Sequence, residues 1–345
     1  MNSLLDLVGG SPVAWIDSDL PLPHPGFWAK LEAVSVGGMK ARAAVAMLAG
    51  ARRRGELQPG ALVVESTSGS LGLGLSLAAS AFGHPLTLVV DDELEWSMRG
   101  LLAAHGATLE VVTSPDPVGG WQEARLKRIR RLLRDNPGAY WPDQYNNPDN
   151  SRGYQSLADE LIAQLPPADV LICSVGTGGH SAGILSGIRR HWPDVRLVGV
   201  DSLGSTIFGQ PARPRLMRGL GSSIYPRNVA YDQFHEVHWV SPRDAVATCR
   251  LLAGAAQIAG GWSTGAAALV AAWQARVEPG ARVVVVLPDG PHRYLGTIYD
   301  DDWCRARGLL GPATRTPVEI CDPHHVEATT WSRCVRVSDP LKVAG

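Results

Sequence analysis

The 345-residue sequence has little net charge and no long apolar run. Its 32 Lys and Arg residues nearly balance its 33 Asp and Glu residues, so the formal net charge is −1. Such a chain has no overall electrostatic field to attract nucleic acid or an anionic membrane. No stretch approaches about 18 uncharged apolar residues, and the opening MNSLLDLVGGSPVAW lacks the basic and apolar regions of a signal peptide. We therefore expect a cytoplasmic protein that binds neither nucleic acid nor a membrane.

Cysteine is scarce as well. The five cysteines are scattered, odd in number and without a CxxC pair, which argues against a disulfide framework and favours a reducing compartment. Four residues near the C-terminus could in principle bind zinc: Cys321, His324, His325 and Cys334. Their spacing is not that of a standard zinc finger, so we expect no metal site.

Glycine, by contrast, is abundant, with 38 residues. Apolar β-branched runs alternate with Ala- and Leu-rich stretches, as in ALVVEST (61–67), LGLGLSLAASAFG (71–83) and PLTLVVDD (85–92). This alternation predicts strand, helix and strand in turn, which is typical of a parallel sheet covered on both faces. The pattern restarts after the Asn- and Pro-rich stretch 142–153. We therefore predict an α/β protein with two open α/β domains.

The first glycine cluster, ESTSGSLGLG (65–74), falls between a predicted strand and a predicted helix. The hydroxyls of Ser66, Thr67, Ser68 and Ser70 surround Gly69. Hydroxyl donors and free N–H groups at a helix N-terminus can bind a carboxylate or a phosphate. The alternative is an ordinary Ser or Thr helix cap, although four hydroxyls in five positions exceed what one cap requires.

The second cluster, VGTGGHSAG (175–183), again lies between a predicted strand and a predicted helix. The backbone N–H groups of Gly176, Thr177, Gly178 and Gly179 can wrap a phosphate, because glycine permits close approach and positive φ. Asp201 ends the next predicted strand, where a ribose-binding acid of a dinucleotide site would be placed. The pattern therefore predicts a phosphate site without naming the ligand that carries the phosphate.

The third cluster, VGGMKAR (36–42), places two glycines before Lys40 and a predicted helix after it. A lysine presented in this way could be a Schiff-base amine, whose nucleophilicity rises when desolvation lowers its pKa. The alternative is a solvated surface lysine. The presence of an anion turn and a phosphate turn in the same chain favours the reactive amine.

Six segments follow one another along the chain: VGGSPV near the start, then AKLEAVSVGGMKAR, ESTSGSLGLGLSLAA, DQYNNPDN, GTGGH and VVVVLPDGPHRYL. This ordered set spans roughly residues 5–305. It resembles the cysteine synthase (O-acetylserine sulfhydrylase) family of fold type II pyridoxal phosphate (PLP) enzymes. The resemblance implies two open twisted-sheet α/β domains with the cofactor in the cleft between them.

The resemblance also implies domain limits and an assembly. The large PLP-binding domain would combine residues 1–40 with 150–310. The small domain, which carries the substrate loop, would be 41–149, and 311–345 would form a C-terminal extension. The family suggests a homodimer whose other partners are small amino-acid substrates.

By this resemblance Lys40 is the catalytic lysine, which binds PLP covalently and acts as general base on the substrate Cα. The residues implied to hold the substrate carboxylate are Thr67, Ser68, Gly69 and Gln144. The residues implied to contact the cofactor are Lys40, Ser70, Gly176, Thr177, Gly178, Gly179 and His180. Ser70 replaces an asparagine of the family, and Gly290 falls where a serine normally contacts the pyridine nitrogen.

Within the family, FWAKLE, ESTSG, SLGSTIFG, GGWSTG and YDDDW lie closest to a branch that acts on O-phosphoserine. The implied reaction is β-replacement on O-phosphoserine or O-acetylserine through an α-aminoacrylate, giving cysteine or a cysteine-like amino acid such as S-sulfocysteine. An amine nucleophile, towards 2,3-diaminopropionate, is the alternative. If phosphate is the leaving group, Arg218, Arg125 and Arg152 are candidates to bind it.

Two readings from other functional classes stay open. A nicotinamide-dependent oxidoreductase would use the second glycine cluster and Asp201. A catalytically inactive regulatory relative would bind PLP without turnover, and Gly290 and Ser70 make it conceivable.

Overall fold

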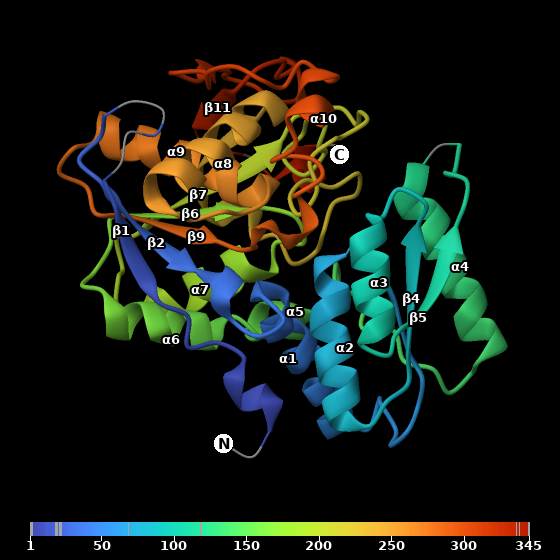
Figure 1. Ribbon diagram of the computed structural model, residues 1–345. Coiled ribbons are helices and arrows are strands. Elements are labelled where there is room, and N and C mark those ends of the chain that lie inside the picture. Colours follow the sequence, from blue (N-terminus) through green and yellow to red (C-terminus); the bar gives the residue numbers. More distant parts are fainter. Residues whose placement is uncertain are drawn as a thin grey trace. The chain divides into compact units, whose positions relative to one another are not determined.

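The computed structural model describes residues 3–17, 20, 23–67, 69–117, 119–335, 337 and 339–343, and Figure 1 labels its elements. The chain forms two compact units. The first comprises Met1–Gly10 and Ser35–Tyr154, and the second comprises Ser11–Val34 and Gln155–Gly345. The domain limits near residues 40 and 150 remain a prediction from the family resemblance.

The first unit contains a sheet of three parallel strands in the order β3 (Val63–Ser66), β4 (Leu86–Asp91) and β5 (Thr108–Val112). Every residue of β3 and β4 is buried. Strands that are buried along their whole length are typical of a sheet covered on both faces. The strands predicted from 61–67 and 85–92 are thereby confirmed.

Helices cover both faces of this sheet, with α2 and α3 on one side and α4 on the other (Figure 1). α1 packs along α2, and α5 packs against α1. α2 ends at Gly83, whose φ of +75° is the left-handed conformation that stops many helices. The helices of this unit are α1 (Met39–Arg54), α2 (Ser70–Phe82), α3 (Trp96–Ala104), α4 (Gly120–Asp135), α5 (Pro148–Arg152) and the 3-10 helix η1 (Leu4–Leu7).

The second unit contains an eight-stranded sheet in the order β1-β2-β9-β6-β7-β8-β11-β10. The five neighbouring strands β2-β9-β6-β7-β8 pair in parallel. In contrast, β1 is antiparallel to β2 and β11 is antiparallel to β8. The sequence pattern predicted the strand before the second glycine cluster and the strand at Asp201, but it did not predict the parallel strands β2 and β8. The strands are β1 (Val13–Ile16), β2 (Phe27–Leu31), β6 (Val170–Ser174), β7 (Arg196–Ser202), β8 (Phe234–Val240), β9 (Val283–Leu287), β10 (Val318–Glu319) and β11 (Ser332–Val335).

In Figure 1, α8 and α9 lie on one face of this sheet and α6 and α7 on the other. α9 is buried on all sides from Trp262 to Ala275, as expected of a helix that is apolar all round. No helix in the described part of the chain is long and apolar enough to cross a membrane. The helices of this unit are η2 (Glu32–Val34), α6 (Gln155–Gln164), α7 (Gly179–Ile188), η3 (Tyr231–Gln233), α8 (Pro242–Ala256), α9 (Trp262–Val277), η4 (Pro291–Arg293), α10 (Asp301–Arg305) and α11 (Pro340–Val343).

The C-terminal segment from residue 311 onward contributes β10 and β11 to this sheet. Trp331, which is completely buried, donates its indole N–H to Nδ1 of His238 on β8 at 3.0 Å. The family resemblance implied only a C-terminal extension from residue 311. The structure anchors this segment in the second unit through strand pairing and this buried hydrogen bond.

Candidate functional site

Lys40 is the second residue of α1, directly after two glycines in the left-handed region. Gly37 has a φ of +72° and Gly38, the N-cap of the helix, a φ of +66°. Residues other than glycine rarely adopt these backbone angles. The Gly-Gly turn therefore allows the chain to enter the helix abruptly and places Lys40 in its first turn.

The four lysines of the chain differ sharply in their partners. Lys30 pairs with Glu160 at 2.7 Å, Lys127 pairs with Asp116, and Lys342 pairs with Asp232 at 2.8 Å. Within the described residues, the Lys40 ammonium has neither a hydrogen bond nor an ion pair. Desolvation by burial lowers the pKa of Lys40 to about 8, and its place at the positive end of a helix dipole acts in the same direction. Lys40 can therefore supply a neutral amine near neutral pH.

α2 approaches α1 closely at Lys40 because Gly74 has no side chain. A Cβ at Gly74 would lie 2.8 Å from the backbone N and Cα of Ala41 and 2.9 Å from the carbonyl carbon of Lys40. These are backbone atoms, which cannot rotate away. Gly74 is thus required for the contact between the helix that presents Lys40 and the helix that follows the serine-rich turn.

We expect the substitution Gly74→Ala to lower the free energy of unfolding by about 1–3 kcal/mol, the usual cost of overpacking a core. The control is Gly100→Ala in α3, where an added Cβ meets no atom within 4 Å. Alanine favours a helix over glycine by roughly 1 kcal/mol, so the control should be neutral or stabilising. Urea unfolding of the two variants measures the difference, and equal midpoints would contradict the packing argument.

The hydroxyl loop (residues 66–70) connects β3 to α2. Gly69 is the N-cap of α2, with a φ of +134°, and it makes no side-chain cap bond. Thr67 is 2% exposed, and its hydroxyl accepts the N–H of Gly69 at 3.0 Å. Ser70 begins the helix and is partly buried, while Ser68 lies outside the described residues. In the described part of the loop the hydroxyls do not form the ordinary helix cap that was the alternative interpretation.

Gln144 lies directly behind the hydroxyl loop. Its side-chain amide donates to the Ser66 carbonyl at 3.0 Å, and its backbone N–H donates to Glu65 Oε2 at 3.2 Å. The structure thereby brings together Gln144 and the end of β3, which are far apart in the sequence.

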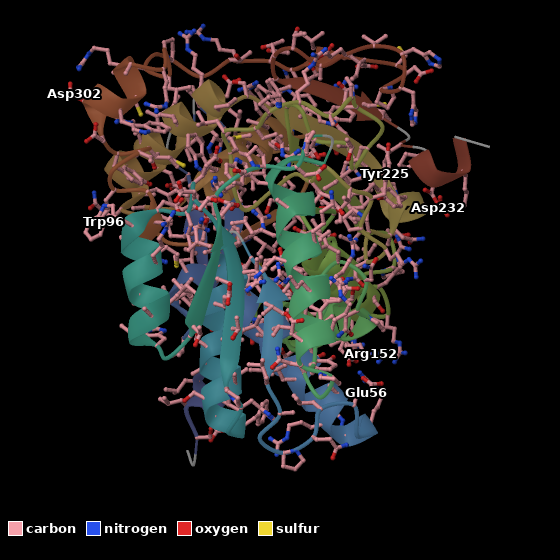
Figure 2. All side chains as sticks on the ribbon, turned by 90° about the vertical axis from the view of Figure 1, so that its right-hand side faces the viewer. Glu56, Trp96, Arg152, Tyr225, Asp232 and Asp302 are labelled. Carbon is pink, nitrogen blue, oxygen red and sulfur yellow. The ribbon has the colours of Figure 1, made fainter. Side chains whose placement is uncertain are left out.

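The candidate arginines occupy three different settings. Arg125 is buried, pairs with Asp91 at the end of β4, and donates from Nε to the Ser66 hydroxyl at 3.1 Å. Arg152 lies at the surface (Figure 2) and binds Asp149 at 2.7 Å. Arg218 lies in the second unit, between β7 and β8, and is partly buried. Arg125 is therefore committed to a buried ion pair beside the loop, and Arg152 to a surface ion pair.

The glycine loop (residues 176–180) connects β6 to α7 in the second unit. Gly178, the N-cap of α7, has a φ of +80° and makes no side-chain cap bond. A Cβ at Gly178 would lie 2.6 Å from the backbone of Val229. The Gly179 N–H points to the Thr177 hydroxyl at 3.4 Å, and His180 is 3% exposed. Glycine is therefore required at position 178 for its backbone angles and for packing.

Two amides of this loop, and the amide of the residue that follows it, have no acceptor in the part of the chain that the structure describes. No acceptor within the described residues takes the N–H of Gly176, Gly178 or Ser181. Free amides in the first turn of a helix, preceded by a left-handed glycine, form an anion site. Asp201, by contrast, is completely buried and accepts the N–H of Ser202 at 2.7 Å. It cannot reach a ribose, so the structure does not support the dinucleotide interpretation.

Asp289, two residues after the end of β9, accepts hydrogen bonds from four donors. It accepts the backbone N–H of Gly261 at 3.2 Å and the hydroxyls of Ser263, Thr264 and Tyr294 at 3.2, 3.0 and 2.7 Å. These bonds fix the beginning of α9 against the end of β9. The motifs GGWSTG and VVVVLPDGPHRYL contain these residues, but the sequence did not indicate that they bind each other.

Gly290 follows this cluster, and a Cβ there would make only ordinary contacts at 3.6 Å with Ala33 and His292. The packing therefore does not require glycine at position 290.

The described residues contain no group of three or more His, Cys, Asp or Glu side chains placed to hold a metal ion. Of the four candidates, Cys334 is buried in β11 and His325 lies 2.8 Å from Asp322.

A family model described as "Pyridoxal-phosphate dependent enzyme" matches residues 4–289. The N-(2-amino-2-carboxyethyl)-L-glutamate synthase of Ralstonia nicotianae is 35% identical over 323 residues, which are 91% of this chain and 96% of that protein. A putative cysteine synthase of Sinorhizobium fredii is 35% identical over 325 residues, 90% of this chain and 94% of that protein. An O-acetylserine dependent cystathionine beta-synthase from Helicobacter pylori is similar in structure, with a TM-score of 0.79 and 26% identity. The match covers 86% of this chain and 98% of that chain.

The residues of each unit suit one part of pyridoxal phosphate. The free amides of the glycine loop suit its phosphate, which binds well at a helix N-terminus. The Lys40 amine, which has no ion pair with any residue in the described ranges, suits its aldehyde, because a neutral amine is the nucleophile in Schiff-base formation. Both features are observed within single units.

Proposed function

Because the chain belongs to the family of pyridoxal-phosphate dependent enzymes, we propose that it catalyses β-replacement on an O-activated L-serine. The observation that carries this proposal is Lys40. It is the one lysine without an acidic partner in the described part of the chain, and burial lowers its pKa to about 8. A partly buried, desolvated amine of this kind can bind the cofactor and then accept a proton from the substrate Cα.

When bound, pyridoxal phosphate supplies the electron sink for the charge that develops at Cα. The chain's own residues would bind, orient and deprotonate. The hydroxyl loop and Gln144 would hold the substrate carboxylate, and the free amides of the glycine loop would hold the cofactor phosphate. Lys40 would remove the Cα proton, after which the leaving group departs from the β-carbon and a nucleophile replaces it.

Two classes of nucleophile are proposed for this reaction. The Ralstonia relative is named for a product in which a 2-amino-2-carboxyethyl group is attached to the nitrogen of glutamate, and this name favours an amine. The Sinorhizobium relative is named a putative cysteine synthase, and this name favours sulfide or another sulfur nucleophile. We propose the amine as the first candidate, because the sequence of the Cupriavidus metallidurans protein with the same glutamate product is also 35% identical.

Two activated serines are proposed as the other substrate. The FWAKLE, ESTSG and GGWSTG motifs favour O-phosphoserine through the family resemblance. The Helicobacter neighbour is named as O-acetylserine dependent, and this name keeps O-acetylserine as the second candidate. A homodimer located in the cytoplasm completes the proposal.

A release assay tests the proposal. PLP-loaded protein is mixed with O-phosphoserine or O-acetylserine, and glutamate, sulfide or thiosulfate is added singly. We expect phosphate or acetate to be released together with one new amino acid, identified by mass spectrometry. Release with a nitrogen-linked product supports the amine, and release with a sulfur-linked product supports the second candidate. Retention of the cofactor without release from either serine would contradict the proposal and favour a regulatory relative.

A further inference from the structure

Glu65 is a buried carboxyl group at the end of β3, directly before the hydroxyl loop. It is 1% exposed. Three donors point to it: the Ser66 N–H at 2.7 Å, the Trp141 indole N–H at 2.9 Å and the Gln144 N–H at 3.2 Å. No cation in the described part of the chain forms an ion pair with it. Such a costly buried carboxyl, supplied with three donors, calls for a physical reason.

The bonds around Glu65 converge on Ser66, the first residue of the hydroxyl loop. Glu65 accepts a hydrogen bond from the Ser66 N–H. The Gln144 side chain donates to the Ser66 carbonyl at 3.0 Å, and Arg125 donates to the Ser66 hydroxyl at 3.1 Å. All three polar groups of Ser66 therefore have a partner. Thr67 follows directly, and its backbone N–H donates to Val89 on β4 at 3.1 Å. The loop thus starts from a firmly held residue.

We infer that Glu65 is a positioning residue that holds Ser66 and Gln144 in place, so that the hydroxyl loop is ordered to receive the substrate carboxylate. The inference rests on the proposed function, because that function makes the loop the carboxylate site. Glu65 itself would touch neither substrate nor cofactor. It acts through Ser66 and Gln144.

The positioning of Ser66 and Gln144 by hydrogen bonds depends on the charge of Glu65. An ionised carboxylate accepts hydrogen bonds from all three donors, whereas a protonated carboxyl turns one oxygen into a donor that faces an N–H group. Burial, and then the charge of Asp143, raise the pKa of Glu65 to about 8, against the bonds from Trp141, Ser66 and Gln144. The ionised Glu65 carboxylate therefore accepts all three hydrogen bonds above this pKa, and this arrangement is lost as the pH falls through it.

The other charged or titratable groups near β3 come from the elements packed against it. β4 contributes Asp91 and α4 contributes Arg125, which pair with each other. The segment after α4 contributes Tyr140, which bridges to Val63, and Asp143. α2 carries no charged residue. Asp143 is thus the charged neighbour that acts on Glu65 most directly.

The first test is Glu65→Gln, which keeps one acceptor oxygen but presents an NH₂ group to the Gln144 N–H. We expect the wild-type KM for the activated serine to rise as the pH falls through about 8. In the variant, KM should be raised about tenfold at high pH, the fold-change for losing one hydrogen bond to a charged group. It should also vary less with pH, and kcat should change little. The control is Glu110→Gln in β5 of the same sheet, where Glu110 forms a partly exposed ion pair with Arg128 of α4. This variant should match the wild type.

Two further variants shift the pKa of Glu65 in opposite directions. Trp141→Phe removes one donor to the carboxylate and should move the midpoint of the KM profile to higher pH. Asp143→Asn removes the nearby negative charge and should move it to lower pH. Asp143 has a φ of +48°, which asparagine tolerates. Opposite shifts support the inference, and they decide the question even if the glutamine variant does not fold.

The outcomes separate this inference from the proposed function. If the wild type releases no leaving group from either activated serine, the proposed function fails. If the wild type turns over but Glu65→Gln keeps or lowers KM, the inference fails. A lower KM would mean that Glu65 mainly repels the substrate carboxylate. A midpoint that does not move in either Trp141→Phe or Asp143→Asn would overturn the inference as well.

Amide hydrogen exchange gives a readout that needs no catalysis. In protein without substrate, exchange in a peptide covering residues 63–72 should be faster in Glu65→Gln than in the wild type, because the loop loses part of its anchor. The control Glu110→Gln should exchange at the wild-type rate in this peptide. Unchanged exchange in Glu65→Gln would contradict a positioning role.

Discussion

The substitution Lys40→Ala should lower kcat/KM for β-replacement by at least about 10³-fold, because in the proposed function it removes both the covalent anchor of the cofactor and the base at Cα. The cofactor should also dissociate on dialysis, and the visible absorbance of the lysine-bound form should be missing. The matched control is Lys127→Ala, since Lys127 lies on the exposed face of α4 and pairs with Asp116. The control should keep its cofactor and its rate.

The pH dependence of cofactor loading tests the environment of Lys40 separately. With a pKa of about 8, the neutral fraction of the amine rises roughly tenfold per pH unit below 8 and levels off above it. The initial rate of PLP binding to cofactor-free wild-type protein should follow this curve. A rate that continues to rise up to pH 10 would indicate an ordinary solvated lysine and contradict the burial argument.

The substitution Gly178→Ala should weaken PLP binding at least about tenfold and destabilise the second unit by about 3 kcal/mol. A left-handed conformation costs a residue other than glycine about 1–2 kcal/mol, and the new Cβ would lie 2.6 Å from the backbone of Val229. Either the glycine loop or the Val229 segment must move. The movement would misplace the amides that are proposed to bind the cofactor phosphate.

Gly308→Ala is the matched control for this prediction. Gly308 also has a positive φ, +65°, but a Cβ there meets no atom within 4 Å. It isolates the cost of the backbone angles, about 1–2 kcal/mol, without the clash and far along the chain from the glycine loop. Fluorescence titration with PLP and thermal unfolding measure both variants. Equal losses of PLP affinity in the two variants would show that the contact with Val229 is unimportant.

Local sequence patterns predicted the elements that carry the candidate site. Strand periodicity and turn residues placed β3 and α2 around the hydroxyl loop, and β6 and α7 around the glycine loop. These elements depend on neighbouring residues, because β-branched runs favour strands and glycine permits the left-handed turns between elements. The α/β fold and the dependence on pyridoxal phosphate, implied by the ordered motifs, are confirmed by the family match.

The same patterns failed where a residue's role depends on a distant partner. Arg125 is indistinguishable in sequence from an anion-binding arginine, yet it forms a buried ion pair with Asp91. Asp201 matched the spacing of a ribose ligand, yet it is completely buried. The segment after residue 311 lacks periodicity, yet β11 pairs with β8. Each outcome follows from contacts between residues that are far apart in the chain.

The sequence by itself thus determined the elements around the two loops, the family and the cofactor, and it predicts that Lys40 is the reactive lysine. Glycine and β-branched residues restrict the backbone locally, so these features can be read from short segments. Only the tertiary structure decided which polar groups are satisfied and which are available. Among the residues that the structure describes, it left Lys40 without an acidic partner, paired Arg125 with Asp91, and enclosed Glu65 behind the hydroxyl loop. Burial and hydrogen bonding set the charge of these groups, and both arise only when distant segments pack together.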